Sequence, residues 1–317
     1  MNNKKQKHIL ITGGAGFIGS NMTKRLLEQG HQVTVLDNFV TGSRENLKDV
    51  ANNTKLTVID HNISKPLKKI FKKIDVILNY ACPASPPAYQ KDSLLTLHAC
   101  SIGVENMLKL ALKYNARFLQ ASTSEVYGNP VEHPQKETYY GNVNSYGPRA
   151  MYDEGQRYAE ALIWVYRKNH NLNTGIIRIF NTYGPFMSPY DGRVISNFIW
   201  QSLNNKPLTI YGDGKQTRSF CYIDDQLDAW EKMIDSDVEG PINIGNPNEI
   251  TINQLVNIVK KITKKEIKIR YSPLPTNDPL KRRPDISKAK NLLKWSPKID
   301  IEEGVGQTVN WMQYLIK

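Results

Sequence analysis

The chain has 317 residues, of which 40% are hydrophobic, and its formal net charge is +12. This length suits one large α/β domain, or a cofactor domain with a smaller substrate domain, and the hydrophobic fraction is sufficient for a core. Nucleic-acid binders are also basic, but the lysines here are scattered along the chain rather than gathered into one stripe. We therefore expect a solvated lysine-rich surface and no nucleic-acid partner.

The sequence carries no signal for a membrane or an oxidising compartment. No stretch of about 18 apolar residues occurs, so we expect no membrane helix. The first residues pass from a few basic side chains directly into an apolar stretch, without the hydrophobic region of a signal peptide. Cys82, Cys100 and Cys221 are widely spaced and form no CxxC pair. We therefore expect neither a disulfide framework nor a metal site, and a reducing cytoplasm is the favoured location.

The first half of the chain alternates short apolar stretches, typical of buried strands, with longer stretches of helical periodicity. The predicted strands span residues 8–14, 32–37, 55–60, 75–81, 117–122 and 174–180. The predicted helices include residues 17–30, which end at a glycine suited to a C-cap, and residues 92–115. This alternation predicts an α/β fold with a Rossmann-type, doubly wound parallel sheet.

The pattern becomes less regular after about residue 181. Short strands are predicted at 207–212 and 241–245, and helices at 251–262 and 285–293, among proline-rich turns. We interpret residues 1–181 as a cofactor-binding Rossmann domain. Residues 182–317 are interpreted as a smaller C-terminal substrate domain, partly interleaved with the first.

A glycine-rich stretch leaves the first predicted strand and enters the first predicted helix. It contains the GxGxxG motif GAGFIG (residues 14–19), and it also matches a Gly13-x-x-Gly16-x-x-Gly19 pattern. These glycines allow a tight turn and close approach of a pyrophosphate, and the helix N-terminus supplies N–H donors. Asp37 ends the second strand, 18 residues after Gly19. A carboxylate there accepts hydrogen bonds from the adenosine ribose hydroxyls and repels a 2′-phosphate, so NAD is favoured over NADP.

Two further stretches carry side chains suited to acid–base chemistry. The first, ASTSEVYG (121–128), follows a predicted strand and carries Thr123, Ser124 and Glu125. Its position is the carboxyl end of the sheet, where ligands bind in this class of fold. The second, residues 147–162, begins a helix that carries Tyr152. We interpret these side chains as candidate catalytic groups.

These residues resemble the extended short-chain dehydrogenase/reductase family, and within it the UDP-glucuronate decarboxylases, also called UDP-xylose synthases. The resemblance covers nearly the whole chain, from about residue 8 to residue 315. Its most specific motifs are PASPP (83–87), STSEVYG (122–128), HPQKETYYGNVN (133–144), DGRVISNF (191–198), YGDGKQTRSF (211–220) and KRRPDI (281–286).

The residues after Thr123 distinguish the branches of this family. A sugar 4,6-dehydratase has an aspartic acid at the position of Ser124, so elimination of water would lack its acid here. A 4-epimerase usually lacks the glutamate and needs no arginine beside a carboxylate. Glu125 and Arg282 fit a substrate that carries and then loses CO2.

The resemblance therefore implies decarboxylation of UDP-glucuronate to UDP-xylose through a 4-keto intermediate. NAD+ would take hydride from C4 while Tyr152 takes the hydroxyl proton, and the resulting β-keto acid would lose CO2. Glu125 with Thr123 or Ser124 would orient the sugar and handle its protons, and Arg282 would lie near the carboxylate. Hydride would then return to C4, so NAD stays bound through turnover.

The resemblance also implies two sets of binding residues. The cofactor set is Gly13, Gly16, Phe17, Ile18, Gly19, Asp37, Asn38, Phe39, Thr41, Gly42, Asn62, Ile63, Tyr80, Cys82, Ala121, Tyr152, Gln156 and Thr182. The substrate set is His98, Asn106, Glu125, Asn181, Arg193, Asn197, Tyr211, Gln216, Arg218 and Arg282.

A homodimer is the expected assembly, since relatives commonly dimerise through a four-helix bundle. The helices at about 92–114 and 151–169 would supply it. Apolar side chains there are compatible with this role but would equally suit packing on the sheet; they are Leu94, Leu95, Leu162 and Trp164.

Gln156 departs from the family pattern, which places a lysine one turn after the catalytic tyrosine. A cation there lowers the tyrosine pKa and binds the nicotinamide ribose, whereas glutamine can donate and accept hydrogen bonds but supplies no charge. We expect a rate loss of order 10²–10⁴ unless another cation compensates, and His98 and Arg149 are the candidates. His98, Cys100, Asn62 and Phe186 depart from the pattern as well.

Two other functions stay open on the sequence. His98 and Phe186 favour a related NAD enzyme that acts on another UDP-sugar or stops at the 4-keto-pentose. Gln156 and Cys100 favour a catalytically impaired homologue that binds UDP-sugars.

Overall fold

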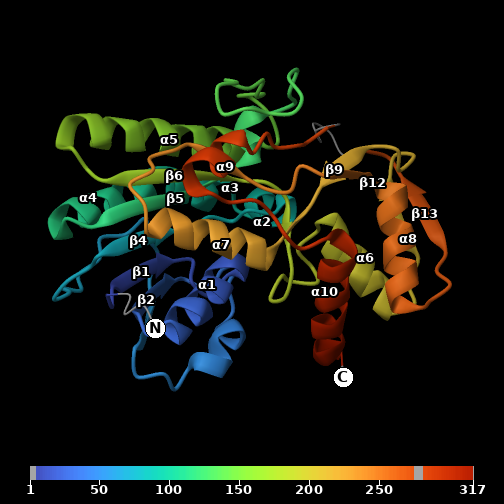
Figure 1. Cartoon of the computed structure of the whole chain (residues 1–317), viewed down its shortest axis with the longest axis horizontal. Coiled ribbons are helices and arrows are strands. Elements are labelled where there is room, and N and C mark those ends of the chain that lie inside the picture. Colours follow the sequence, from blue (N-terminus) through green and yellow to red (C-terminus); the bar gives the residue numbers. More distant parts are fainter. Residues whose placement is uncertain (1–4, 275–280, 317) are drawn as a thin grey trace.

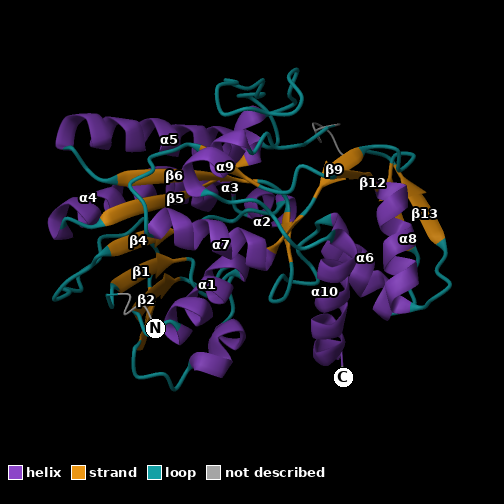
Figure 2. Ribbon diagram, viewed as in Figure 1, coloured by secondary structure: helices purple, strands orange, loops and turns teal. Residues whose placement is uncertain are grey.

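A parallel sheet of seven strands forms the centre of one half of the molecule, in a computed structural model that describes residues 5–274 and 281–316 (Figures 1 and 2). The strand order is β11-β6-β5-β4-β1-β2-β3, and all neighbours pair in parallel. The strands are β1 (His8–Thr12), β2 (Gln32–Asp37), β3 (Leu56–Asp60), β4 (Val76–Asn79), β5 (Arg117–Thr123), β6 (Thr174–Ile179) and β11 (Ile242–Ile244). The predicted doubly wound parallel sheet is confirmed. Its order reverses between β1 and β4, and such folds bind ligands beyond the carboxyl ends of the strands at this point.

Alternate strand side chains meet different helices, because successive residues of a strand point to opposite faces of the sheet. The helices on the two faces are α1 (Phe17–Glu28) with α7 (Ile223–Ile234), and α4 (Val104–Tyr114) with α5 (Ala150–His170). Ile9 and Ile11 of β1 join the buried apolar cluster that includes α1 and α7. Leu10, between them, joins the cluster that includes α4 and α5. The near-continuous apolar strands of the sequence therefore fill two cores at once.

The helix predicted over residues 92–115 contains a break in its regular geometry. Asp92 caps α3 (Ser93–His98) through a hydrogen bond from the Leu95 N–H to its side chain, 2.9 Å long. A π-helical turn over Ala99–Gly103 follows and leads into α4, which ends at Asn115 in the left-handed conformation. Turns of this kind are frequent at functional sites, and this one buries Cys100.

The other half of the molecule is built mainly from the C-terminal part of the chain (Figure 1). Its elements are α6 (Val194–Leu203), β8 (Leu208–Tyr211), β9 (Thr217–Ser219), β12 (Glu249–Thr251), α8 (Ile252–Thr263), β13 (Ile269–Ser272) and α10 (Ile301–Ile316). Strand β8 pairs in parallel with β13, and β9 pairs antiparallel with β12. Helix α8 begins at a capping box, in which Thr251 and Gln254 satisfy each other's backbone N–H groups. One apolar cluster includes Val35 of the sheet and Phe198 of α6, so a single core links the halves.

The remaining elements are short. They are η1 (Arg44–Val50), α2 (Pro86–Lys91), η3 (Ser124–Tyr127), β7 (Thr182–Tyr183), β10 (Cys221–Tyr222) and α9 (Ser287–Leu293). Strand β11 and helix α7 follow residue 182 in sequence, yet β11 pairs with β6 and α7 packs on the sheet. The predicted boundary between a cofactor domain (1–181) and a substrate domain (182–317) therefore does not coincide with a boundary in space. It stays a prediction about which residues bind which ligand. Among the described residues, no helix combines the length and apolar character that crossing a bilayer requires.

Candidate active site

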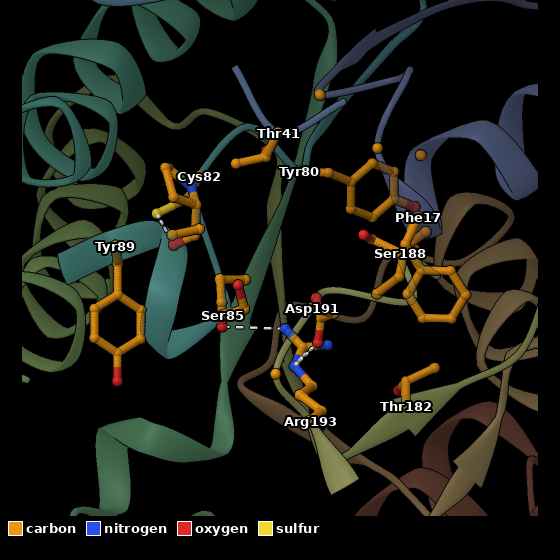
Figure 3. Close-up of a pocket in the computed structure, with 18 of the residues that line it drawn as sticks. Phe17, Thr41, Tyr80, Cys82, Ser85, Tyr89, Thr182, Ser188, Asp191 and Arg193 are labelled. Carbon is orange, nitrogen blue, oxygen red and sulfur yellow. Dashed lines mark hydrogen bonds and ion pairs between the residues drawn. The ribbon is translucent and has the colours of Figure 1, made fainter. Parts of the chain in front are cut away.

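A cavity of about 1330 Å³ lies between the carboxyl edge of the sheet and the second half of the molecule. Its wall includes the glycine-rich turn after β1, the ends of β4, β5 and β6, and residues of α6, β8 and β9. Figure 3 shows Cys82 and Tyr89 on one side of this space, with Phe17 and Tyr80 on the other. This volume is large enough for a ligand of dinucleotide or nucleotide-sugar size.

The glycine-rich turn is packed so closely that side chains have no room. Gly13 has φ +67°, and a Cβ added there would lie 2.9 Å from the Ala81 nitrogen. A Cβ on Gly19 would lie 2.1 Å from the Gly13 carbonyl oxygen. Gly16 is the N-cap of α1 and has no side chain to occupy the first N–H groups of that helix. The backbone thus presents a cradle for an anion such as a pyrophosphate.

Asp37 lies at the end of β2, beside this cradle. Its Oδ2 accepts from the Ala15 N–H (2.9 Å) and its Oδ1 accepts from the Phe39 N–H (2.8 Å). Burial raises the pKa of Asp37, and these two hydrogen bonds oppose the increase. Each carboxylate oxygen keeps acceptor capacity, so the group can also receive two ribose hydroxyls.

A glutamate held between two arginines forms the polar end of the cavity. Arg282 donates from Nη1 to the Ser124 carbonyl (2.6 Å) and from Nη2 to Glu125 Oε2 (3.2 Å). Arg149 donates from Nη2 to the same Glu125 oxygen (2.5 Å). Burial raises the pKa of Glu125, but Arg282 and Arg149 outweigh it and hold the pKa below its usual value. Glu125 is therefore ionised at neutral pH, with excess positive charge beside it.

Tyr152 lies near the start of α5 and is 6% exposed. Its ring stacks on that of Tyr89 at 5.1 Å, with 4° between the planes. Burial raises the pKa of Tyr152 well above 10, while a hydrogen bond with the Thr123 side chain and the charge of Arg193 oppose the increase. Arg193, which the sequence interpretation had assigned to the substrate, is thus a cation that acts on this phenol.

Gln156 follows one helical turn later and is also buried. Its Nε2 donates to Cys100 Sγ at 3.6 Å. Its Oε1 is buried and has no hydrogen-bond partner among the described residues. A buried carbonyl oxygen without a donor is costly, and a ligand hydroxyl in the cavity would satisfy it.

Asp153, next to Tyr152, adds a second buried carboxyl group. Its Oδ2 lies 3.7 Å from Arg149 Nε, and its Oδ1 is buried without a hydrogen-bond partner in the described part of the chain. Burial raises the pKa of Asp153 to about 7, and the charge of Glu125 acts in the same direction.

Most of the residues expected from the sequence line this cavity. The cofactor set contributes Gly13, Gly16, Phe17, Ile18, Gly19, Asp37, Asn38, Thr41, Asn62, Ile63, Tyr80, Cys82, Ala121, Tyr152, Gln156 and Thr182. The catalytic and substrate sets contribute Thr123, Ser124, Glu125, Asn181, Arg193, Asn197, Tyr211, Gln216, Arg218 and Arg282.

Four expected residues are not part of the cavity wall. Phe39 adopts a left-handed conformation (φ 56°), and its ring lies under Arg44. Gly42 packs against the Asp37 carboxylate, where an added Cβ would lie 2.9 Å from Oδ2. Asn106 of α4 donates to the Ile63 carbonyl at 2.8 Å, so it supports the cofactor side of the wall. His98 is exposed at the end of α3. His98 is therefore not placed to supply the charge that Gln156 lacks, because it is exposed and lies outside the cavity wall.

Several wall residues were absent from the sequence-based sets. Tyr89 is the clearest, together with the 83–87 stretch that runs into the first turn of α2, and Arg149 had been considered only as a compensating cation. The 83–87 motif was visible in the sequence, and Arg149 lies three residues before Tyr152. The stacking partner of Tyr152 could not have been found from the sequence, since Tyr89 lies far from it in the chain and only the fold brings the two rings together.

These observations fit NAD as the bound cofactor. The glycine turn and the N-terminus of α1 would hold its pyrophosphate, Asp37 its adenosine ribose, and the unpartnered Gln156 Oε1 the nicotinamide ribose.

Comparison with known proteins gives the family. The profile of the NAD dependent epimerase/dehydratase family matches residues 9–245. The chain belongs to this family, within the extended short-chain dehydrogenases/reductases.

Individual proteins show the same similarity. UDP-glucuronic acid decarboxylase 1 of Arabidopsis thaliana is 47% identical over 97% of this chain and 70% of its own length. The Danio rerio protein of the same name is 45% identical over 98% of this chain and 74% of its own length. Among solved structures, UDP-glucuronic acid 4-epimerase of Bacillus cereus with UDP-glucuronic acid and NAD matches with a TM-score of 0.88. That match has 29% identity and covers 97% of this chain and 99% of the epimerase chain.

Proposed function

We propose that this chain is an NAD-dependent decarboxylase that converts UDP-glucuronate to UDP-xylose through a 4-keto intermediate. The observation that carries the proposal is the Glu125 carboxylate held between Arg282 and Arg149 in the same cavity as Tyr152. Two arginines around one glutamate leave a net positive site, which suits a substrate that arrives with a carboxylate of its own. Relatives at 47% and 45% identity that are named UDP-glucuronic acid decarboxylases support the same assignment.

The side chains of the site divide the reaction into steps. NAD, when bound, supplies the hydride acceptor that oxidises C4 and later returns the hydride. Tyr152 takes the C4 hydroxyl proton, and the Thr123 hydroxyl, its hydrogen-bond partner, holds the phenol in place. The C4 ketone lies β to the carboxylate, so CO2 leaves while its bonding electrons enter an enolate. A proton from solvent is then added to C5, and Tyr152 returns its proton to the C4 oxygen. The net reaction consumes one proton and gives UDP-xylose and CO2.

Glu125 and the arginines position the sugar. The carboxylate accepts sugar hydroxyls, with Ser124 beside it, and Arg282 lies where it can face the substrate carboxylate. Arg218, Arg193, Asn181, Asn197, Tyr211 and Gln216 also line the cavity, where we expect them to bind the UDP-sugar. Most of these groups come from the 182–317 segment. We therefore call this segment a substrate domain because of what it would bind.

Gln156 can bind the nicotinamide ribose through its free Oε1 but cannot lower the Tyr152 pKa by charge. We therefore propose a slow enzyme rather than an inactive one, since Thr123 and Arg193 still favour the phenolate. The similarity to named decarboxylases gives no support to the two alternatives, which were action on a different UDP-sugar and a purely binding role.

A homodimer is proposed from exposed apolar side chains on α3, the π-helical turn and α5. Leu94 is 66% exposed and Trp164 is 65% exposed, and Ile102 and Tyr158 are exposed on the same elements. A face of this kind is covered when two copies pack these helices together. The three cysteines are free thiols, which supports a reducing cytoplasmic location.

The proposal is tested by incubating the purified chain with UDP-glucuronate and NAD+ and measuring CO2, UDP-xylose and NADH. We expect UDP-xylose and CO2 in equal amounts with no net NADH. Tyr152→Phe is the matched control, because it keeps the ring stack on Tyr89 and removes only the hydroxyl. Turnover equal to that of Tyr152→Phe would contradict the proposal.

A further inference from the structure

Two cysteine sulfurs meet in the wall of the cavity. Cys82 Sγ and Cys100 Sγ lie 3.2 Å apart, although the residues are 18 positions apart in sequence. Both are free thiols, and either can donate to the other. Neither the proposed decarboxylation nor the binding of UDP-glucuronate needs such a pair.

The two cysteines differ in exposure and in their position relative to the cavity. Cys82 follows β4 in the loop before α2, is partly exposed, and lines the cavity, as Figure 3 shows. Cys100 lies behind it on the π-helical turn and is 1% exposed. A small reagent that enters the cavity therefore reaches Cys82 first, with Cys100 already in contact.

Cys100 cannot move away from this contact. A Cβ added to Gly155 of α5 would lie 3.0 Å from the Cys100 Cβ, so the backbone of α5 closes that side. The Gln156 amide also donates to Cys100 Sγ at 3.6 Å. The sulfur is thus fixed against the helix that carries Tyr152 and Gln156.

We propose that Cys82 and Cys100 form an oxidation site, in which hydrogen peroxide closes the two thiols into a reversible disulfide that lowers turnover. The effect on turnover rests on the proposed decarboxylase function, whereas formation of the disulfide does not.

The chemistry needs one peroxide for each closure. The Cys82 thiolate attacks the O–O bond, forming a sulfenic acid and releasing hydroxide, which takes up the proton lost by the thiol and becomes water. Cys100 sulfur then attacks the Cys82 sulfur, forming the S–S bond and expelling the sulfenic oxygen as a second water. Two thiols are oxidised to one disulfide, and one peroxide is reduced to two waters. The contact with Cys100 and burial raise the pKa of the Cys82 thiol, so closure is slow near neutral pH.

Closure must deform the cofactor end of the cavity. The sulfurs have to approach by roughly an ångström to bond, and because Cys100 is held by α5, the Cys82 loop moves. That loop follows Tyr80 and leads into the 83–87 stretch of the wall. The Cys100 sulfur also becomes a poorer acceptor for Gln156, the residue proposed to bind the nicotinamide ribose.

The decisive experiment is disulfide mapping of the NAD-loaded full chain after treatment with hydrogen peroxide. Non-reducing digestion and mass spectrometry should find Cys82 and Cys100 peptides linked, 2 Da below the sum of the free peptides, and dithiothreitol should separate them. Cys221, which is fully buried with its thiol directed to the Tyr222 carbonyl, serves as the internal reference and should stay a free thiol. Absence of the linked peptide while Cys82 is oxidised further would overturn the proposal.

Cys100→Ser is the matched variant, since a hydroxyl keeps an acceptor for Gln156. After peroxide treatment it should form no linked peptide and, relative to its own untreated turnover, lose activity in a way that dithiothreitol does not restore, because Cys82 then oxidises irreversibly. The wild type should lose turnover at least about tenfold and regain it with dithiothreitol. A linked peptide with unchanged turnover would contradict the proposed effect. If the untreated chain makes no UDP-xylose, the decarboxylase assignment fails, while the linked peptide still decides the oxidation site.

Discussion

Gln156 and Tyr152 occupy one face of α5, one turn apart, and their chemistry decides the rate of the proposed reaction. The phenol is buried and its pKa is well above 10, so the phenolate needed to accept the C4 proton is scarce. A cation at position 156 would favour that phenolate, whereas an amide adds no charge to the effects of Thr123 and Arg193 that oppose burial.

Gln156→Lys is therefore expected to raise kcat by about 10²-fold and to move the acidic limb of the pH–rate profile to lower pH. The direction follows from the sign of the charge, because a cation lowers the pKa of a group that must ionise. Gln156→Glu is the matched variant of opposite charge, and it should raise the Tyr152 pKa and slow turnover. Equal rates for the lysine and glutamate variants would show that charge at this position does not control the step.

Asp153 offers a pH-dependent test of burial. Its pKa is about 7 in the folded protein against an ordinary value of 3.8, so the folded state binds more protons than the unfolded state between these values. Stability should then fall as pH rises from about 4 to about 7, because unfolding releases the group to ionise freely.

Asp153→Asn removes this ionisation. The melting temperature of the variant minus that of the wild type should therefore be larger at about pH 8 than at about pH 5. Glu154→Gln is the control, since the neighbouring side chain is 37% exposed and pairs with the similarly exposed Arg157. Thermal unfolding of the three proteins at both pH values measures the difference. A gap between Asp153→Asn and the wild type that is the same at both pH values would rule out a buried, proton-binding Asp153.

At the scale of elements, the turn between β1 and α1 forms the cradle for the cofactor. The Gly13 carbonyl and the Gly19 Cα are packed together, so the first turn of α1 approaches the sheet without any side chain between them. That approach directs the N–H groups of the helix into the cavity.

Gly19→Ala is expected to lower NAD affinity by about 10²-fold or more, since its Cβ would lie 2.1 Å from the Gly13 carbonyl oxygen and the turn must open. Gly306→Ala in α10 is the control, because an added Cβ there has no atom within 4 Å. It should leave NAD affinity unchanged and stabilise the helix by roughly 0.5–1 kcal/mol. Calorimetric titration with NAD+ measures both, and unchanged affinity in Gly19→Ala would contradict the role of this turn.

At the scale of the whole molecule, the apolar side chains of α3 and α5 lie on a face that the chain itself leaves exposed. Leu94 and Trp164 are the most exposed of the four side chains assigned to the dimer, while Leu95 and Leu162 are partly buried. The proposed interface also includes the π-helical turn that carries Cys100 and the helix α5 that carries Tyr152 and Gln156, so dimerisation would stiffen the back of the active site.

Trp164→Glu should convert the proposed dimer to a monomer, because a charge in the middle of an apolar helix interface costs several kcal/mol when it is buried. Ile70→Glu is the control, since Ile70 is 77% exposed in a loop outside these helices. Light scattering after size-exclusion chromatography measures the mass of each. A monomeric wild type would refute the proposed assembly directly.

The sequence alone determined the features that depend on local spacing. Alternation of strands and helices predicted the doubly wound sheet, and the glycine spacing with Asp37 predicted a dinucleotide site, because both follow from residues close together in the chain. The i, i+4 spacing likewise placed Tyr152 and Gln156 on one face of a helix.

Only the tertiary structure decided which distant side chains meet. Arg282 reaches Glu125 across 157 positions, Tyr89 stacks on Tyr152, and Cys82 touches Cys100, while His98 is exposed and does not line the cavity. The π-helical turn at 99–103 has no local signal either, and it changes which residues of that helix face inward. These contacts depend on strand order and on how loops close over the sheet edge, and a linear pattern of residue types specifies neither.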